Sequence, residues 1–82
     1  MSEIFSKKIK ERRKEKKITQ IEMAKLLEIN VRTYQDYEYG IVNPTIDICV
    51  KIADILQTSL DYLTGRTGRT GYNDTENKKN DE

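Results

Sequence analysis

The chain has 82 residues, of which 35% are charged and 35% hydrophobic, and its 15 Lys and Arg residues nearly balance 14 Asp and Glu residues. This length and composition predict one small globular domain with a thin core. The sequence contains no histidine, which removes the commonest general base and metal ligand. It also contains no Gly-rich phosphate loop and no nucleophile elbow. We therefore expect no catalytic residues, no metal site and no cofactor.

Cysteine usage and hydropathy indicate where the protein works. Cys49 is the only cysteine, so no intrachain disulfide can form, which favours a reducing cytoplasm. No apolar run is long enough to span a membrane, and the N-terminus lacks the apolar segment of a secretion signal. We therefore expect a cytoplasmic protein without a membrane partner.

The first predicted helix covers about residues 2–16. Phe5, Ile9 and the pair Arg12 and Arg13 recur at helical spacing, which gives a narrow apolar stripe. Residues 7–17 hold eight Lys and Arg against two Glu. This run is either a solvated helix face or a positive surface that faces phosphates.

The second and third predicted helices cover residues 20–27 and about 31–39. Each has a recognisable cap in the sequence. The caps are Thr19 with Glu22 before the second helix, Asn30 before the third, and Gly40 after it. The inner faces are expected to carry Met23, Ala24 and Leu27, with Ile21 beside them, and then Tyr34 and Tyr37.

The fourth and fifth predicted helices cover about residues 46–56 and 59–63. Pro44 blocks a helix before the fourth, and Thr45 caps it. The fourth helix is apolar on more than one face, so we expect it to be central. Its predicted core residues are Ile46, Cys49, Val50, Ile52, Ala53 and Leu56, and Leu60 and Leu63 are expected to point inward from the fifth.

The last two helices carry more apolar side chains than a domain of this size is expected to bury. These side chains are Ile48, Ile55, Tyr62 and Leu63. Exposed apolar side chains that lie together mark interaction surfaces. They predict a homodimer formed through the last two helices, and a monomer at every concentration would contradict this prediction.

The C-terminal segment differs in composition from the rest of the chain. Residues 65–82 contain one aromatic and no aliphatic side chain, so they cannot bury enough surface to offset the entropy of ordering. We expect a folded domain over residues 1–64 and a polar, disordered tail over 65–82. A basic arm through Arg66 and Arg69 that contacts nucleic acid is a minor alternative.

Two short capped helices joined by a tight turn are typical of a helix-turn-helix. In that motif the first helix lies across the DNA backbone and the second lies in the major groove. Ala24 fits this interpretation because a small side chain in the first helix lets the second pack closely. Spacing alone is not decisive, since many helical bundles contain a capped pair.

Several short motifs strengthen this interpretation. They are Thr19-Gln20-x-Glu22-x-Ala24, Tyr37-Glu38-x-Gly40, Asn43-Pro44-Thr45, Ile52-Ala53-x-x-Leu56 and Ser59-Leu60-Asp61. In this order, residues 3–64 resemble the phage-repressor type of DNA-binding domain, the Cro/CI-like or XRE family. The resemblance implies an all-α, compact five-helix lambda-repressor-like fold with helices two and three as the helix-turn-helix. It also implies a sequence-specific transcriptional regulator, in most cases a repressor bound as a homodimer to a palindromic operator.

The resemblance implies roles for matching positions. Base contacts are expected from Val31, Arg32, Gln35 and Asp36, and phosphate contacts from Gln20, Tyr39 and Asn43. Arg13 and Glu38 match a salt bridge that joins the first and third helices. Arg32 can pair with guanine, Gln35 can pair with adenine or contact a phosphate, and Asp36 can accept from cytosine or orient Arg32.

Three positions depart from the family pattern. Glu28 and Gln57 replace common glycines, and Arg12 replaces an aliphatic residue, which is expected to thin the core. A left-handed backbone at a non-glycine residue costs on the order of 1 kcal/mol. These departures concern the turns and the core, and no predicted DNA-facing position is lost.

Two other functions are open on the sequence alone. One is an antitoxin-like or other protein-interaction module of the same fold, with a regulatory protein as partner. The other is a small hydrolase, against which the missing histidine and the lack of clustered carboxylates argue.

Overall fold

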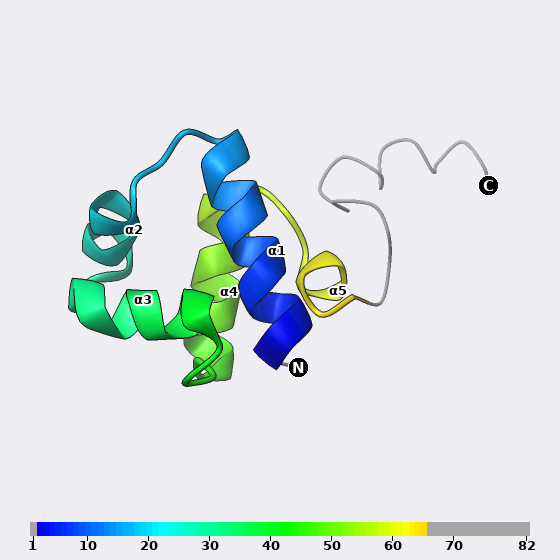
Figure 1. The fold of residues 1–82 in the computed structure, drawn as a ribbon. Coiled ribbons are helices and arrows are strands. Elements are labelled where there is room, and N and C mark those ends of the chain that lie inside the picture. The colour runs from blue at the N-terminus through cyan, green and yellow to red at the C-terminus, as the bar shows by residue number, and fades with distance from the viewer. Residues whose placement is uncertain (1, 66–82) are drawn as a thin grey trace.

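The structure is a computed structural model that describes residues 2–65. It confirms the all-α, five-helix fold (Figure 1), and each helix end lies within one residue of its predicted position. The helices are α1 (Ser2–Glu15), α2 (Gln20–Leu27), α3 (Val31–Tyr39), α4 (Ile46–Ile55) and α5 (Leu60–Leu63). The predicted tail, with Arg66 and Arg69, lies outside the described residues except for Gly65.

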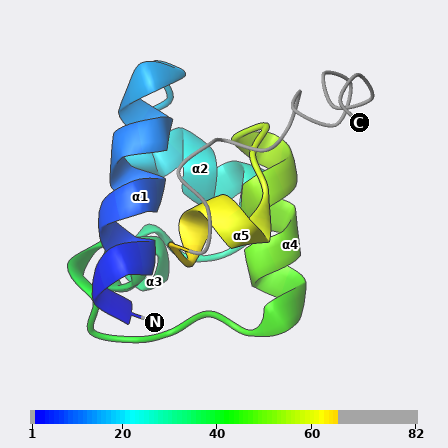
Figure 2. The same cartoon turned by 90° about the vertical axis from the view of Figure 1, so that its right-hand side faces the viewer.

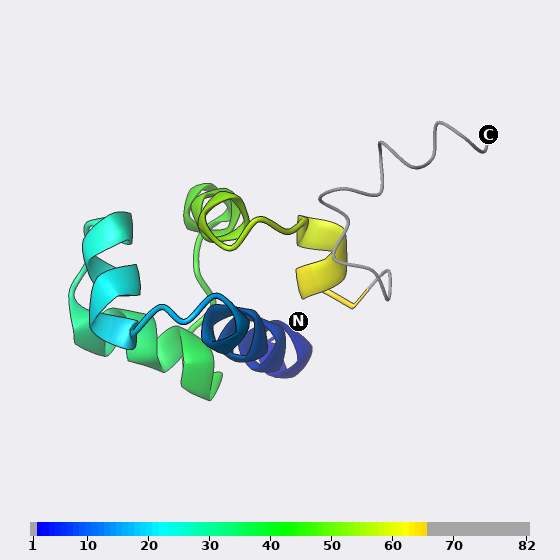
Figure 3. The ribbon, with the colours of Figure 1, turned by 90° about the horizontal axis from the view of Figure 1, so that it is seen from above.

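The five helices surround one small core. α2 and α3 lie on one side of α1 and α4, and α5 lies on the other (Figures 1 and 3). Seen from that other side, α5 lies between α1 and α4 (Figure 2). The largest fully buried side chains come from all five helices and one helix end: Tyr34, Phe5, Ile9, Met23, Leu27, Ile52, Leu56 and Leu63.

The helix boundaries follow from local hydrogen bonding. The Thr19 hydroxyl accepts from the backbone N–H of Glu22, and the Glu22 carboxylate accepts from the Thr19 N–H, which completes the predicted capping box. Asn30 caps α3. Thr45 and Ser59 accept from the third residue of α4 and α5 in the same way.

Among residues 2–65, three non-glycine residues adopt the left-handed conformation just after a helix. They are Lys17 (φ 59°), Glu28 (φ 60°) and Gln57 (φ 54°). Glu28 and Gln57 therefore keep the backbone that glycine would have, and each accepts a strain of about 1 kcal/mol. At both positions the backbone thus has the conformation that glycine favours.

The Arg12 side chain is bound to the end of α4, and the expectation that it thins the core stays a prediction. Its Nε donates to the Leu56 carbonyl at 2.8 Å, and an Nη donates to the Gln57 carbonyl at 3.0 Å. The last carbonyls of a helix have no partner within that helix, and a cation near them also suits the helix dipole. Arg12 therefore closes the C-terminal end of α4 from α1.

The predicted inner faces need two corrections. Ile46 and Val50 on α4 are 70% and 42% exposed, and Ile21 on α2 is 59% exposed, so these side chains lie outside the core. α4 packs against α2 and α5, and Ile46 and Val50 lie on the part of α4 that these helices do not cover.

The dimer surface predicted on the last two helices also needs correction. Leu63 is fully buried and belongs to the core, because α5 packs between α1 and α4. Ile48, Ile55 and Tyr62 are partly buried and pack against the same core. These three side chains therefore keep only part of the apolar area that the prediction assigned to a second copy.

Candidate nucleic-acid interface

α2 and α3 are held together by a turn of three residues. Glu28 ends α2, and its N–H donates to the carbonyls of Ala24 and Lys25. Asn30 then begins α3 by accepting from the Arg32 N–H at 2.8 Å. Ala24 is 3% exposed, so its methyl group is in the contact between helices, as a close crossing requires. The two helices form a helix-turn-helix with its second helix open on one face.

The predicted base-contacting residues lie on that helix with different exposures. The Arg32 side chain is 78% exposed, and its Nε lies 3.4 Å from the Asp36 carboxylate, whose side chain is 22% exposed. The carboxylate thus orients Arg32 along the helix. Gln35 is half-buried, and Val31 is half-buried because part of it packs against the core. Arg32 is the side chain freest to enter a groove.

The opposite face of α3 carries a buried ionic cluster. The Arg13 guanidinium donates to both carboxylate oxygens of Glu38, at 2.6 and 3.2 Å. Its third hydrogen bond goes to the Ile18 carbonyl at 2.8 Å. The Tyr34 hydroxyl also donates to Glu38. The Glu38 side chain has no exposed area and that of Arg13 has 10%, so α1 and α3 are joined by a pair that water barely reaches.

The titration of these groups follows their surroundings. Burial tends to raise the pKa of Glu38, but hydrogen bonds from Arg13, Tyr34 and Gln20 together hold it below its ordinary value of 4.5. Hydrogen bonding to Glu38 raises the pKa of Arg13. Burial raises the pKa of Tyr34, so its hydroxyl keeps its proton and remains a donor. The cluster is a carboxylate surrounded by donors.

A chain of hydrogen bonds leads from this cluster to the open face of α3. The Gln20 Nε2 donates to Glu38 at 3.0 Å, and the Gln20 Oε1 accepts from the Gln35 Nε2 at 3.1 Å. The resemblance assigned Gln20 to a phosphate, but nothing in the sequence indicates these two side-chain bonds. They join residues 18 and 15 positions apart, whereas sequence periodicity describes only neighbours on one helix.

The other predicted phosphate-contacting residues lie around the end of α3. Tyr39 is 61% exposed and Asn43 is also exposed. Gly40 (φ 76°) ends the helix, and its N–H donates to the carbonyls of Asp36 and Tyr37. Both side chains are thus exposed close in sequence to the end of α3.

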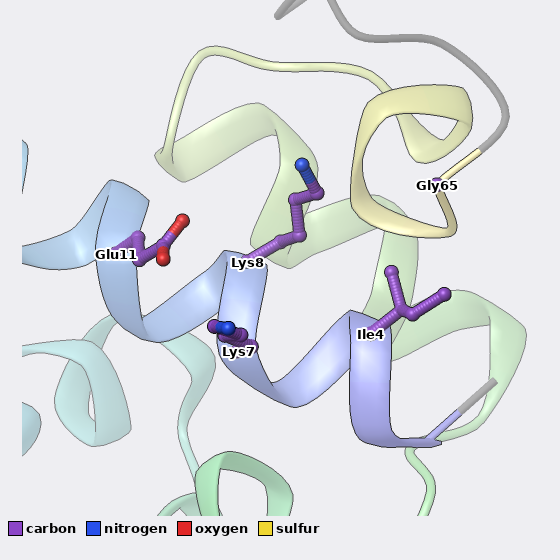
Figure 4. Close-up of a pocket in the computed structure, with 5 residues that line it drawn as sticks. All are labelled: Ile4, Lys7, Lys8, Glu11 and Gly65. Atoms are coloured by element: carbon purple, nitrogen blue, oxygen red, sulfur yellow. The ribbon is translucent and has the colours of Figure 1, made fainter.

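The basic run of α1 divides between solvent and structure. Lys7, Lys10 and Lys14 are exposed, whereas Arg12 and Arg13 make the structural contacts described above. A shallow hollow beside this run is lined by Ile4, Lys7, Lys8, Glu11 and Gly65 (Figure 4). It lies next to α5, on the side of the domain away from α3 (Figure 1). The hollow is therefore not part of the α3 surface.

Other kinds of site find little support in the part of the chain that is described. No three His, Cys, Asp or Glu side chains among residues 2–65 gather so that they could hold a metal ion. Cys49 is buried, and burial raises the pKa of its thiol, as expected for a small core residue. No helix in this range has the length and apolar character needed to cross a membrane.

Comparison with known proteins agrees with the geometry. A family model described as helix-turn-helix matches residues 9–63. The chain is 43% identical over 60 residues to YqaE of Bacillus subtilis, an uncharacterized HTH-type transcriptional regulator, covering 73% of this chain and 52% of that protein. It is 46% identical over 63 residues to the cryptic phage CTXphi transcriptional repressor RstR of Vibrio cholerae, covering 72% of this chain and 56% of that protein.

The match to these two relatives is partial in length. The chain spans about half the length of the curated relatives it matches. No solved structure matches it significantly.

Proposed function

Because the chain belongs to the helix-turn-helix family, we propose that it is a sequence-specific double-stranded DNA-binding regulator that represses transcription. The observation that carries this proposal is the open face of α3. Arg32 projects from it at 78% side-chain exposure, while the buried ion pair of Arg13 and Glu38 fixes the opposite face to α1. A rigid helix with exposed polar side chains suits the major groove.

The proposed contacts divide into two kinds. Arg32 pairs with guanine and Gln35 with a neighbouring base, and these contacts supply sequence preference. Gln20, Tyr39 and Asn43 contact phosphates, which supplies affinity that falls steeply with salt. Repression follows from occupying a promoter, a role in keeping with the name of the phage relative RstR.

The test is selection of binding sites from randomised double-stranded DNA, followed by sequencing. We expect the wild-type protein to select one motif, and Arg32→Ala Gln35→Ala to keep weak, salt-sensitive binding without that motif. Lys7→Ala Glu11→Ala is the control, because these exposed residues line the hollow on α1 that is not part of the α3 surface. No motif from the wild-type protein would contradict the proposal and favour a protein-interaction module, such as an antitoxin.

We further propose that the protein binds a palindromic operator as a homodimer, with the two copies meeting where the apolar surface is open. Ile41 (67%), Val42 (46%), Ile46 (70%) and Val50 (42%) are exposed within ten residues of chain directly after α3. Exposed apolar side chains grouped in this way favour an interface. A two-fold dimer would place two α3 helices about 34 Å apart, one turn of DNA.

Sedimentation over a range of concentrations tests the dimer. Ile46→Asp should shift the protein to monomer, because a carboxylate would be desolvated at the interface. Leu26→Asp is the matched control, since Leu26 is 57% exposed on α2, outside the proposed surface. Monomer at all concentrations in the wild-type protein, with and without operator DNA, would contradict the dimer.

A further inference from the structure

Glu38, although buried, is joined to the open face of α3 through Gln20 and Gln35. Glu38 and Gln20 are linked at 3.0 Å, and Gln20 and Gln35 at 3.1 Å. An ionised carboxylate can only accept hydrogen bonds. The atom of Gln20 that faces Glu38 must therefore be the amide nitrogen, and the Gln20 carbonyl oxygen must point the other way.

The same reasoning fixes the next amide along. The Gln20 oxygen can only accept, so the atom of Gln35 that faces it must be Nε2. A carboxamide nitrogen has two hydrogens, one beside the carbonyl oxygen and one opposite to it. When the opposite one donates to Gln20, the carbonyl oxygen and the remaining N–H of Gln35 are left side by side. That edge presents one acceptor and one donor.

We propose that Glu38, acting through Gln20, fixes the orientation of the Gln35 carboxamide so that Gln35 contacts adenine. Adenine offers the matching pair in the major groove, with a donor at N6 and an acceptor at N7. Guanine offers two acceptors there, which would leave the Gln35 oxygen facing another oxygen. This inference rests on the proposed function, and it makes Gln20 a positioning residue in addition to any phosphate contact.

Three features of the structure support a fixed orientation. The Glu38 side chain has no exposed area, so water does not compete for its oxygens. The bonds from Arg13 and Tyr34 hold the carboxylate in one place on the inner side. Gln20 is the first residue of α2 and lies within the capping box of Thr19 and Glu22, so its backbone is fixed as well.

The test compares base preference in the wild-type protein, Gln20→Met, Gln35→Met and the double variant. Binding-site selection on each should show one operator position where Gln35→Met reduces the preference for adenine over guanine by roughly 5- to 100-fold. Gln20→Met should reduce the preference at that same position and leave the others unchanged. The double variant should be no worse there than Gln35→Met. Methionine keeps the length of glutamine, and thermal unfolding checks that each variant is folded.

Several outcomes would overturn the inference. If Gln20→Met lowers affinity equally for all sequences and leaves the base preference intact, Gln20 is only a phosphate ligand. If the base pair whose preference is lost in Gln35→Met is G·C in the wild-type motif, Gln35 does not present its acceptor and donor to adenine, and the inference is wrong. If the wild-type protein selects no motif at all, the proposed function is itself wrong and this inference falls with it.

Discussion

Replacing Arg13 with methionine tests how far the fold depends on the buried ion pair. The change removes two hydrogen bonds to Glu38, at 2.6 and 3.2 Å, and leaves a carboxylate with no exposed area without its cation. Breaking a buried pair by removing one partner typically costs about 3–5 kcal/mol of unfolding free energy. Two bonds between charged groups, at about 1.5–3 kcal/mol each, give a similar range.

This loss is large for so small a domain. A folded unit of about 64 residues has a total stability of roughly 3–10 kcal/mol. We therefore expect Arg13→Met to lower the urea midpoint sharply at pH 7, and to leave a large unfolded fraction in buffer if the wild type lies near the lower end. Circular dichroism at 222 nm during urea titration measures both.

The double variant Arg13→Met Glu38→Gln separates the charge from the packing. Glutamine removes the unpaired charge and keeps an acceptor for Tyr34, so we expect it to restore part of the stability that Arg13→Met loses. A loss below about 1 kcal/mol for Arg13→Met, the value of an exposed pair, would refute the reasoning. A double variant less stable than Arg13→Met would refute it too.

Three further predictions concern pH and helix ends. The pKa of Glu38 is below its ordinary 4.5, so the stability that its ionised form contributes is present above about pH 4.5. This stability is lost as the pH falls through the folded-state pKa. Urea midpoints should therefore fall less with acid in Glu38→Gln than in the wild type. Glu28→Gly should raise the thermal midpoint by relieving up to about 1 kcal/mol of left-handed strain, whereas Lys25→Gly within α2 should lower it by a similar amount; equal effects would contradict this. Arg12→Met should lower the free energy of unfolding by about 1–3 kcal/mol, because two carbonyls at the end of α4 lose their donor. Arg12→Lys should restore little of this stability, since an ammonium lacks the planar fork of a guanidinium. Full recovery in the lysine variant would contradict the geometry.

The helices were predictable because their signals are local. Thr19, Asn30 and Thr45 accept from backbone groups two or three residues away, and Gly40 ends α3 by its own backbone conformation. Apolar spacing likewise predicted that Tyr34 and Tyr37 share the inner face of α3, where both are buried. Each of these signals lies within one turn of one helix, so one sequence suffices to find it.

The wrong predictions concern which face of a helix is covered by a neighbouring helix. Ile46 and Val50 are apolar at helical spacing, yet they are exposed, while Leu63 is buried. Periodicity shows that side chains share a face but not whether a neighbour covers it. The contacts of Arg12 could not be predicted for the same reason, since its carbonyl partners are 44 and 45 residues away. The amide chain from Glu38 to Gln35 runs through Gln20 on another helix and has no local signal.

Arg12 and Arg13 are neighbours in the sequence, yet they bind in different directions. Arg12 donates to the Leu56 carbonyl at the end of α4, and Arg13 donates to the Glu38 carboxylate on α3. A single turn of α1 thus binds both α3 and the end of α4, and neither helix can separate from α1 while these hydrogen bonds hold. Unfolding should therefore be one cooperative event, in which the slowest-exchanging amides of α3 and α4 share one opening free energy.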